Sequence, residues 1–293
     1  MTITSLDLSG KIDKGAVSAL GRIHQISSSM NIPFFIVGAT ARDILLEVHY
    51  GIGSKRATVD IDIAVFIENW DQFKRLKEAL TGVPDFTPTK DIQRLLFKKR
   101  LPVDIVPFGG IAEKEDLIEW PPDGSIKMSV TGFRECFKHA VEVKISDKPK
   151  LSVNVVSLAG LAILKLISWD ENIARRQKDA SDLVFIIQNY LDAGNLERFF
   201  EEAPDIVDSG DYDYELGSAR LLGRDISKFA YTSTVEKLIE ILNRESQGKQ
   251  GHKIAMDALQ GSRLSEESYE EVSDLFDALL KGLTDDRNRK NMR

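Results

Sequence analysis

Short apolar runs, bounded by glycine, proline or charged residues, dominate the first half of the chain. Runs of this length that are rich in β-branched and aromatic residues are typical of strands. They predict strands at residues 32–38, 59–67, 95–97, 103–106, 141–145 and 151–155. Helical spacing predicts a helix over residues 39–48, and Asn69 followed by Gln72 predicts the start of another that runs to about residue 80.

Longer apolar patterns with helical spacing replace the short runs after residue 157. They predict helices at residues 158–169, 178–190, 211–230, 235–242 and 266–283. The change of pattern predicts an α+β protein. We expect a domain over residues 1–155, built on a small mixed β-sheet flanked by helices, and a helical domain over residues 156–293.

Charge and composition narrow the possible functions. The chain carries 39 basic and 46 acidic residues, a net charge of −7, which argues against non-specific coating of nucleic acid. Cys136 is the sole cysteine, so neither an intramolecular disulfide nor a cysteine-based zinc site can form. The most apolar stretch, residues 155–169, is too short to span a bilayer. We therefore expect a soluble cytoplasmic protein with no membrane association.

Two aspartates interrupt the predicted strand at residues 59–67. Asp60 and Asp62 are two positions apart, so their side chains point to the same face while Ile61 and Ile63 point to the other. An exposed strand face would explain them, but aspartate is disfavoured in strands. Paired carboxylates are also hard oxygen ligands for Mg²⁺, which usually binds to one or two carboxylates together with substrate phosphates.

Asp104 lies in a second apolar strand and extends the pattern. If this strand is a neighbour of residues 59–67, Asp104 joins Asp60 and Asp62. Three carboxylates could then hold two metal ions in the geometry of phosphoryl or nucleotidyl transfer. Taken alone, Asp104 could equally be a residue near the end of a strand.

Residues 38–40 lie where a predicted strand ends and a helix begins. Free backbone N–H groups at such a place favour phosphate, and a glycine lets the phosphate approach closely. Gly38 and Ala39 would offer backbone N–H groups, and Thr40 a hydroxyl. The alternative is a glycine that serves only the turn.

Together these motifs resemble the polymerase-β-like nucleotidyltransferase superfamily, and within it the AbiE-type toxin nucleotidyltransferases of bacterial toxin–antitoxin systems. The resemblance spans about residues 30–190. Its carriers are residues 37–43 (VGATARD), 58–65 (TVDIDIAV), 103–105 (VDI), 164–169 (LKLISW) and 176–182 (RQKDASD). Ala39 stands where this family usually has glycine or serine.

The resemblance implies a nucleotidyltransferase catalytic domain over residues 1–155, a nucleoside triphosphate donor and two Mg²⁺ ions. Asp60, Asp62 and Asp104 would be the catalytic and metal-binding residues, and Gly38, Ala39 and Thr40 would bind the donor. It also implies that Lys165 neutralises the triphosphate, although a lysine in an apolar helix can simply extend to the surface. A methionine at position 165 is then expected to leave folding intact.

The predicted function is transfer of a nucleoside monophosphate to an acceptor hydroxyl of RNA, such as tRNA, or of protein, with an antitoxin as a further partner. A phosphatase-like hydrolase fits less well, because such enzymes place their aspartates after the apolar part of the strand. Ala39 motivates the other alternative, a non-catalytic nucleotide-binding interaction protein on the same fold.

Overall fold

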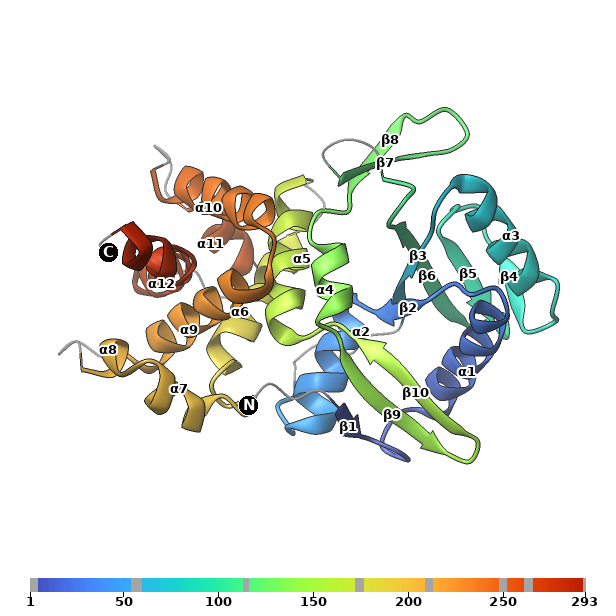
Figure 1. Ribbon diagram of the computed structural model, residues 1–293, viewed down its shortest axis with the longest axis horizontal. Helices are drawn as coiled ribbons and strands as arrows, with labels where there is room; N and C mark the ends of the chain where they lie inside the picture. Colours follow the sequence, from blue (N-terminus) through green and yellow to red (C-terminus); the bar gives the residue numbers. More distant parts are fainter. Residues whose placement is uncertain are drawn as a thin grey trace. The chain divides into compact units, whose positions relative to one another are not determined.

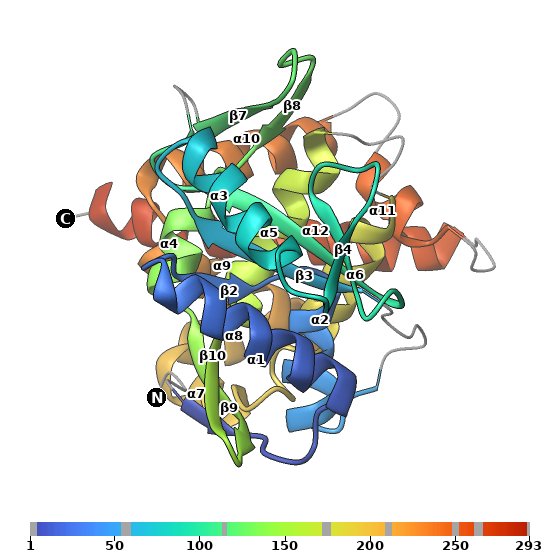
Figure 2. The same cartoon turned by 90° about the vertical axis from the view of Figure 1, so that its right-hand side faces the viewer.

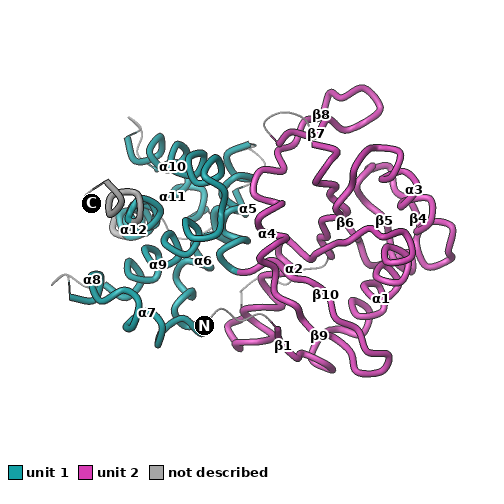
Figure 3. The backbone as a smooth tube through the Cα atoms, in the orientation of Figure 1, with its two compact units in different colours: residues 1, 158–293 teal, residues 2–157 magenta. Residues whose placement is uncertain are grey.

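The computed structural model describes residues 5–53, 60–112, 116–171, 177–208, 213–247, 252–260 and 266–291. Residues 58, 59 and 176 of the motifs above lie outside these ranges. The chain divides into two compact units, Thr2–Ser157 and Leu158–Arg293, the second of which also includes Met1 (Figure 3). None of the helices in the described ranges is both long and apolar enough to cross a membrane.

The first unit is built on a mixed β-sheet with strand order β1-β9-β10-β2-β3-β6-β5-β4 (Figure 1). Its strands are β1 (Ser5–Asp7), β2 (Phe34–Ile36), β3 (Ile61–Phe66), β4 (Phe86–Pro88), β5 (Arg94–Phe97), β6 (Leu101–Phe108), β9 (Val141–Asp147) and β10 (Lys150–Val155). A separate hairpin consists of β7 (Leu117–Trp120) and β8 (Ile126–Ser129). The structure confirms the α+β class and the mixed sheet.

Helices lie on both faces of this sheet. They are α1 (Lys14–Ser29), α2 (Gly38–Arg42), the π-helix η1 (Asp43–His49), α3 (Trp70–Thr81) and α4 (Phe133–Lys138). Helices α1 and α3 lie side by side against one face, and α4 lies on the other (Figures 1 and 2). The side chain of Asn69 accepts a hydrogen bond from the Gln72 N–H and begins α3, as the sequence predicts.

Successive side chains of β2 point to opposite faces of the sheet and pack against different helices. Phe34 contacts His24 of α1, whereas Phe35 packs against Phe133 and Phe137 of α4. Both phenylalanines are buried, because helices cover the strand from both sides. The central strands are therefore fixed by packing on both faces, and side chains at their ends have a rigid base.

The second unit is helical. Its helices are α5 (Leu158–Glu171), α6 (Gln177–Asn189), α7 (Leu196–Glu202), α8 (Pro204–Val207), α9 (Tyr214–Phe229), α10 (Thr232–Gln247), α11 (Lys253–Ala258) and α12 (Glu266–Asn291). Gly223 of α9 and Gly282 of α12 let these two helices approach closely, because a Cβ on Gly282 would lie 2.1 Å from the Arg220 carbonyl oxygen. Short helices α7, α8 and α11 carry too few apolar repeats for sequence periodicity to reveal them.

Candidate active site

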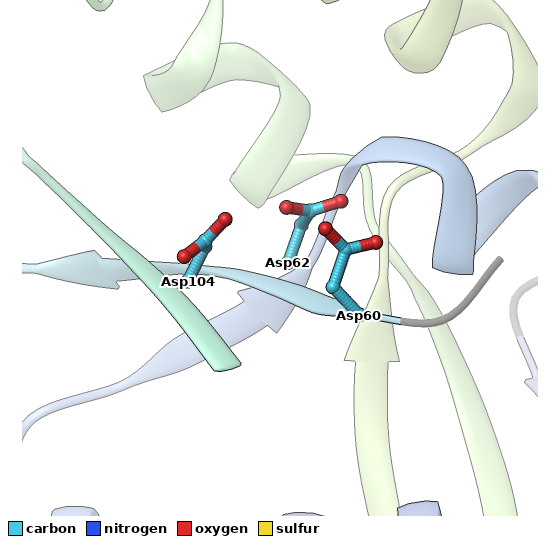
Figure 4. Close-up of side chains that lie close together, drawn as sticks. All are labelled: Asp60, Asp62 and Asp104. Carbon is cyan, nitrogen blue, oxygen red and sulfur yellow. The ribbon is translucent and has the colours of Figure 1, made fainter. Parts of the chain in front are cut away.

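Two parallel strands bring three aspartates together on one face of the sheet. Strands β3 and β6 pair so that Asp62 lies beside Asp104, and Asp60 immediately precedes β3. One carboxylate oxygen of each aspartate lies within 4.8 Å of one of each of the others (Figure 4). The structure thus brings together the three residues that the sequence singles out.

Burial on the opposite face explains why the carboxylates hold this position. Ile61, Ile63 and Ile105 are at most 2% exposed, so a shift of either strand by one residue would move them out of the core. The aspartates lie on the other face and remain partly accessible. The apolar core therefore fixes which side of the sheet presents acidic groups.

Gly38 lies directly against the acidic cluster. It follows β2, its φ is +65°, and a Cβ on it would lie 2.2 Å from Oδ2 of Asp62. The preceding Val37 N–H donates a hydrogen bond to the Asp62 carbonyl oxygen over 2.9 Å. Only glycine fits this backbone conformation and this close approach without strain. The sequence predicts that Gly38 lets a phosphate approach the backbone; in the structure it is the Asp62 carboxylate that lies close to Gly38.

Thr40 is also tied to the aspartates. Its hydroxyl donates a hydrogen bond to the Asp60 carbonyl oxygen over 2.7 Å. The hydroxyl proton is therefore used in a bond to the main chain, and this bond holds the residue that precedes β3 in place. Gly38, Ala39 and Thr40 all lie in the first turn of α2, next to the cluster. Their role in donor binding stays a prediction.

Arg94 is the functional candidate that the sequence analysis missed. On β5 it pairs with Asp104 of β6, and its Nε and Nη2 atoms donate to the two Asp104 carboxylate oxygens over 2.7 and 2.6 Å. Nη2 also lies 3.4 Å from Oδ2 of Asp60. The hydrogen bonds to Asp104 raise the pKa of Arg94, so the guanidinium stays charged.

A signal for Arg94 was present in the sequence. The predicted strands on either side of residues 98–100 form a hairpin, and counting outward from Phe97 and Leu101 places Arg94 opposite Asp104. Directly opposed residues of an antiparallel pair are close enough to interact.

Lys165 belongs to a buried ion cluster of the helical unit. Its Nζ lies 2.6 Å from Oδ1 of Asp179 and 2.6 Å from Oδ2 of Asp182, and all three side chains are at most 10% exposed. Burial alone would lower the pKa of Lys165, but the two carboxylates outweigh that effect and raise it. In the described structure the ammonium of Lys165 therefore pairs with the carboxylates of Asp179 and Asp182. A role of Lys165 in binding a triphosphate stays a prediction.

The turn at residues 38–40 thus lies against Asp60 and Asp62 at β3, and Asp104 of the adjacent β6 completes the cluster. In a family comparison, the model for "Nucleotidyl transferase AbiEii toxin, Type IV TA system" matches residues 27–278. The chain therefore belongs to the AbiEii family of nucleotidyltransferase toxins. No curated protein matches the sequence.

Solved structures give more distant matches. The antibiotic-resistance factor ANT(2'')-Ia is 13% identical, with a TM-score of 0.33 over 68% of this chain and 98% of its own. The Thermotoga maritima CCA-adding enzyme complexed with tRNA is 17% identical, with a TM-score of 0.33 over 91% and 67%. An H. pylori putative nucleotidyltransferase is 12% identical, with a TM-score of 0.31 over 94% and 98%.

Proposed function

We propose that this chain transfers a nucleoside monophosphate from a nucleoside triphosphate to an acceptor hydroxyl, with Mg²⁺ held by Asp60, Asp62 and Asp104. The observation that carries the proposal is the acidic cluster, whose carboxylate oxygens approach within 4.8 Å on adjacent strands. Membership of a nucleotidyltransferase family supports the reaction class.

The residues fit a magnesium site by their chemistry. Mg²⁺ prefers carboxylate oxygens and is usually completed by substrate phosphates and water. All three aspartates are partly exposed, so their carboxylates are accessible from solvent. When bound, the metal would neutralise charge on the phosphates during transfer. Gly38 supports the site because it has no side chain that would clash with the Asp62 carboxylate.

In the proposed reaction, the acceptor oxygen forms a bond to the α-phosphorus of the donor. The bond from that phosphorus to the bridging oxygen breaks, and pyrophosphate leaves. Asp104 accepts the proton of the acceptor hydroxyl, while the strands hold Asp60 and Asp62 in place. Little covalent chemistry is required of the protein, since positioning and charge neutralisation supply most of the catalysis in phosphoryl transfer.

We propose RNA, such as tRNA, or protein as the acceptor, and an antitoxin as the protein partner. The toxin–antitoxin description of the family supports the antitoxin. Residues 1–155 would form the catalytic domain and residues 156–293 the helical domain. Lys165 and the turn at residues 38–40 remain our candidates for donor binding.

The test uses donors labelled at two positions. The protein is incubated with Mg²⁺, cellular RNA or protein, and a triphosphate labelled on either the α- or the γ-phosphorus. Nucleotidyl transfer moves the α-label and leaves the γ-label in pyrophosphate, whereas a kinase would do the reverse. Asp62→Asn should abolish labelling, and Asp71→Asn, on the exposed first turn of α3, should not. Triphosphate binding without transfer to any acceptor would instead support the non-catalytic alternative.

A further inference from the structure

Arg94 occupies the acidic cluster from the side of β5. Its guanidinium donates hydrogen bonds to both carboxylate oxygens of Asp104, over 2.7 and 2.6 Å, and its Nη2 lies 3.4 Å from Oδ2 of Asp60. Planar two-point bonding of this kind is the strongest ordinary hydrogen-bonding arrangement between side chains. Arg94 is therefore fixed to the carboxylates by geometry as well as by charge.

The cluster needs a positive charge when no metal is present. Three carboxylates with oxygens within 4.8 Å of one another repel, and the core packing behind β3 and β6 prevents them from moving apart. Arg94 is a basic residue that pairs with both Asp60 and Asp104. Its side chain is 33% exposed, which leaves it a route out of the cluster.

A metal ion and Arg94 compete for the same oxygens. Mg²⁺ must approach its oxygen ligands to about 2.0–2.1 Å, and it carries the same sign of charge as the guanidinium. The N–H groups of Arg94 already use a lone pair on each oxygen of Asp104. Metal binding to Asp104 and Asp60 is therefore opposed by these hydrogen bonds and by charge repulsion.

We propose that Arg94 is an exchangeable counter-ion of the metal site: it neutralises Asp104 and Asp60 in the metal-free protein and passes to the donor triphosphate when metal takes these carboxylates. The proposal rests on the proposed function, because it requires a metal and a triphosphate at this site. A displaced guanidinium stays charged and needs another anion. Phosphate oxygens match its planar fork as carboxylates do.

The proposal predicts two effects of opposite sign. Arg94→Met keeps an apolar stem and removes the competing cation, so it should bind metal alone more tightly. The loss of hydrogen bonds to a charged group corresponds to about tenfold to hundredfold in affinity. The same variant should bind triphosphate more weakly at saturating metal, by a similar factor. A merely structural role for Arg94 would weaken both.

Mn²⁺ is a suitable probe, because carboxylate sites bind it as they bind Mg²⁺ and the free ion is visible by electron paramagnetic resonance. Wild type, Arg94→Met and the control Arg100→Met are titrated with Mn²⁺ alone, then with a non-hydrolysable triphosphate at saturating Mn²⁺. Arg100 lies exposed in the turn that joins β5 and β6, so its variant changes net charge equally. We expect Arg100→Met to match wild type in both titrations.

The outcomes distinguish a failure of the counter-ion proposal from a failure of the proposed function. If Arg94→Met binds Mn²⁺ no more tightly than wild type, or binds triphosphate equally well, the counter-ion exchange is wrong. If wild type and Asp62→Asn bind Mn²⁺ with the same affinity, the proposed metal site itself fails.

A second measurement does not depend on the methionine variant. The Nε–H resonance of Arg94 in the wild-type protein, assigned by its absence in Arg94→Lys, should exchange slowly with solvent before Mg²⁺ is added. Saturating Mg²⁺ together with a non-hydrolysable triphosphate should shift this resonance. A resonance unchanged by Mg²⁺ and the triphosphate together would show that Arg94 keeps Asp104, and would overturn the proposal.

Discussion

Substituting Gly38 by alanine places a methyl group where the Asp62 carboxylate lies. The added Cβ would lie 2.2 Å from Oδ2, 2.7 Å from Cγ and 2.9 Å from Cβ of Asp62. The carboxylate can rotate away, but the Cβ of Asp62 is fixed to β3, which is held by β2 and β6. We therefore expect both a loss of stability and a displaced carboxylate.

Two terms set the size of the stability loss. Gly38 has a φ of +65°, and a left-handed backbone costs a residue with a Cβ about 1–2 kcal/mol. Crowding against Asp62 adds about 1–3 kcal/mol, the usual range for an overpacked site. The sum of about 2–5 kcal/mol is a large part of the total stability of a typical domain, about 5–15 kcal/mol.

Gly10→Ala separates these two terms. Gly10 also has a positive φ, +79°, but a Cβ there would meet no heavy atom within 4 Å. This variant should lose only the backbone term, about 1–2 kcal/mol. Urea unfolding can be followed by tryptophan fluorescence, since Trp70 and Trp120 belong to the same unit as both glycines.

A double mutant tests the assigned cause. In an Asp62→Ala background the 2.2 and 2.7 Å contacts disappear, so Gly38→Ala should cost at least about 1 kcal/mol less than in the wild type. Metal affinity provides the functional measurement, and Gly38→Ala should lower it while Gly10→Ala leaves it unchanged. Equal costs for the two glycine variants, with intact metal binding in both, would refute this argument.

Other predictions follow from buried or capped groups. Lys165→Met should destabilise the helical unit by about 3–5 kcal/mol in urea unfolding, because it removes the ammonium that pairs with the buried carboxylates of Asp179 and Asp182; an unchanged midpoint would contradict this. The Cys136 thiol should react with Ellman's reagent only after denaturation, since burial raises its pKa well above the usual value, and rapid reaction of the native protein would disprove the burial. Asn69→Ala should cost about 1 kcal/mol through the lost cap of α3, with stability equal to wild type as the contrary result.

The prediction for Lys165→Met differs from what the sequence alone suggests. An isolated lysine in an apolar helix can extend to the surface, and a methionine would then be tolerated. The structure instead buries its ammonium between two carboxylates of α6. The sequence shows that Asp179 and Asp182 share a helical face, but it does not show which helix packs against that face.

The strands and long helices were predictable where one local pattern was strong. The apolar runs around Ile36, Ile63 and Ile105 became β2, β3 and β6, and the long helical patterns became α5, α6, α9, α10 and α12. Helix α1 and strand β1 were missed. The strand is only three residues long, so its place depends on pairing with β9 and not on its own composition.

The clustering of the three aspartates was predictable from the sequence, whereas the pairing of Arg94 with them was not. Asp60 and Asp62 share a face by local geometry alone, and Asp104 joins them once β3 and β6 are neighbours. Arg94 required a further step, the exact register of the hairpin that joins β5 to β6. Pairing of distant segments is decided by the whole core, which is why sequence patterns predict faces better than partners.

Because Arg94 pairs with Asp104, a metal that binds to the acidic cluster would have to compete with this ion pair. If the three carboxylates had no internal cation, the metal-free protein would carry their full repulsion, and any divalent ion would relieve it. With Arg94 bound to Asp104, that repulsion is already partly cancelled, so a metal must bring additional favourable contacts to displace it. Triphosphate oxygens supply such contacts to the metal and to the released guanidinium at once. Under the proposed counter-ion exchange, the same three aspartates should favour a metal that arrives with its nucleotide over a metal alone, and this preference should depend on Arg94.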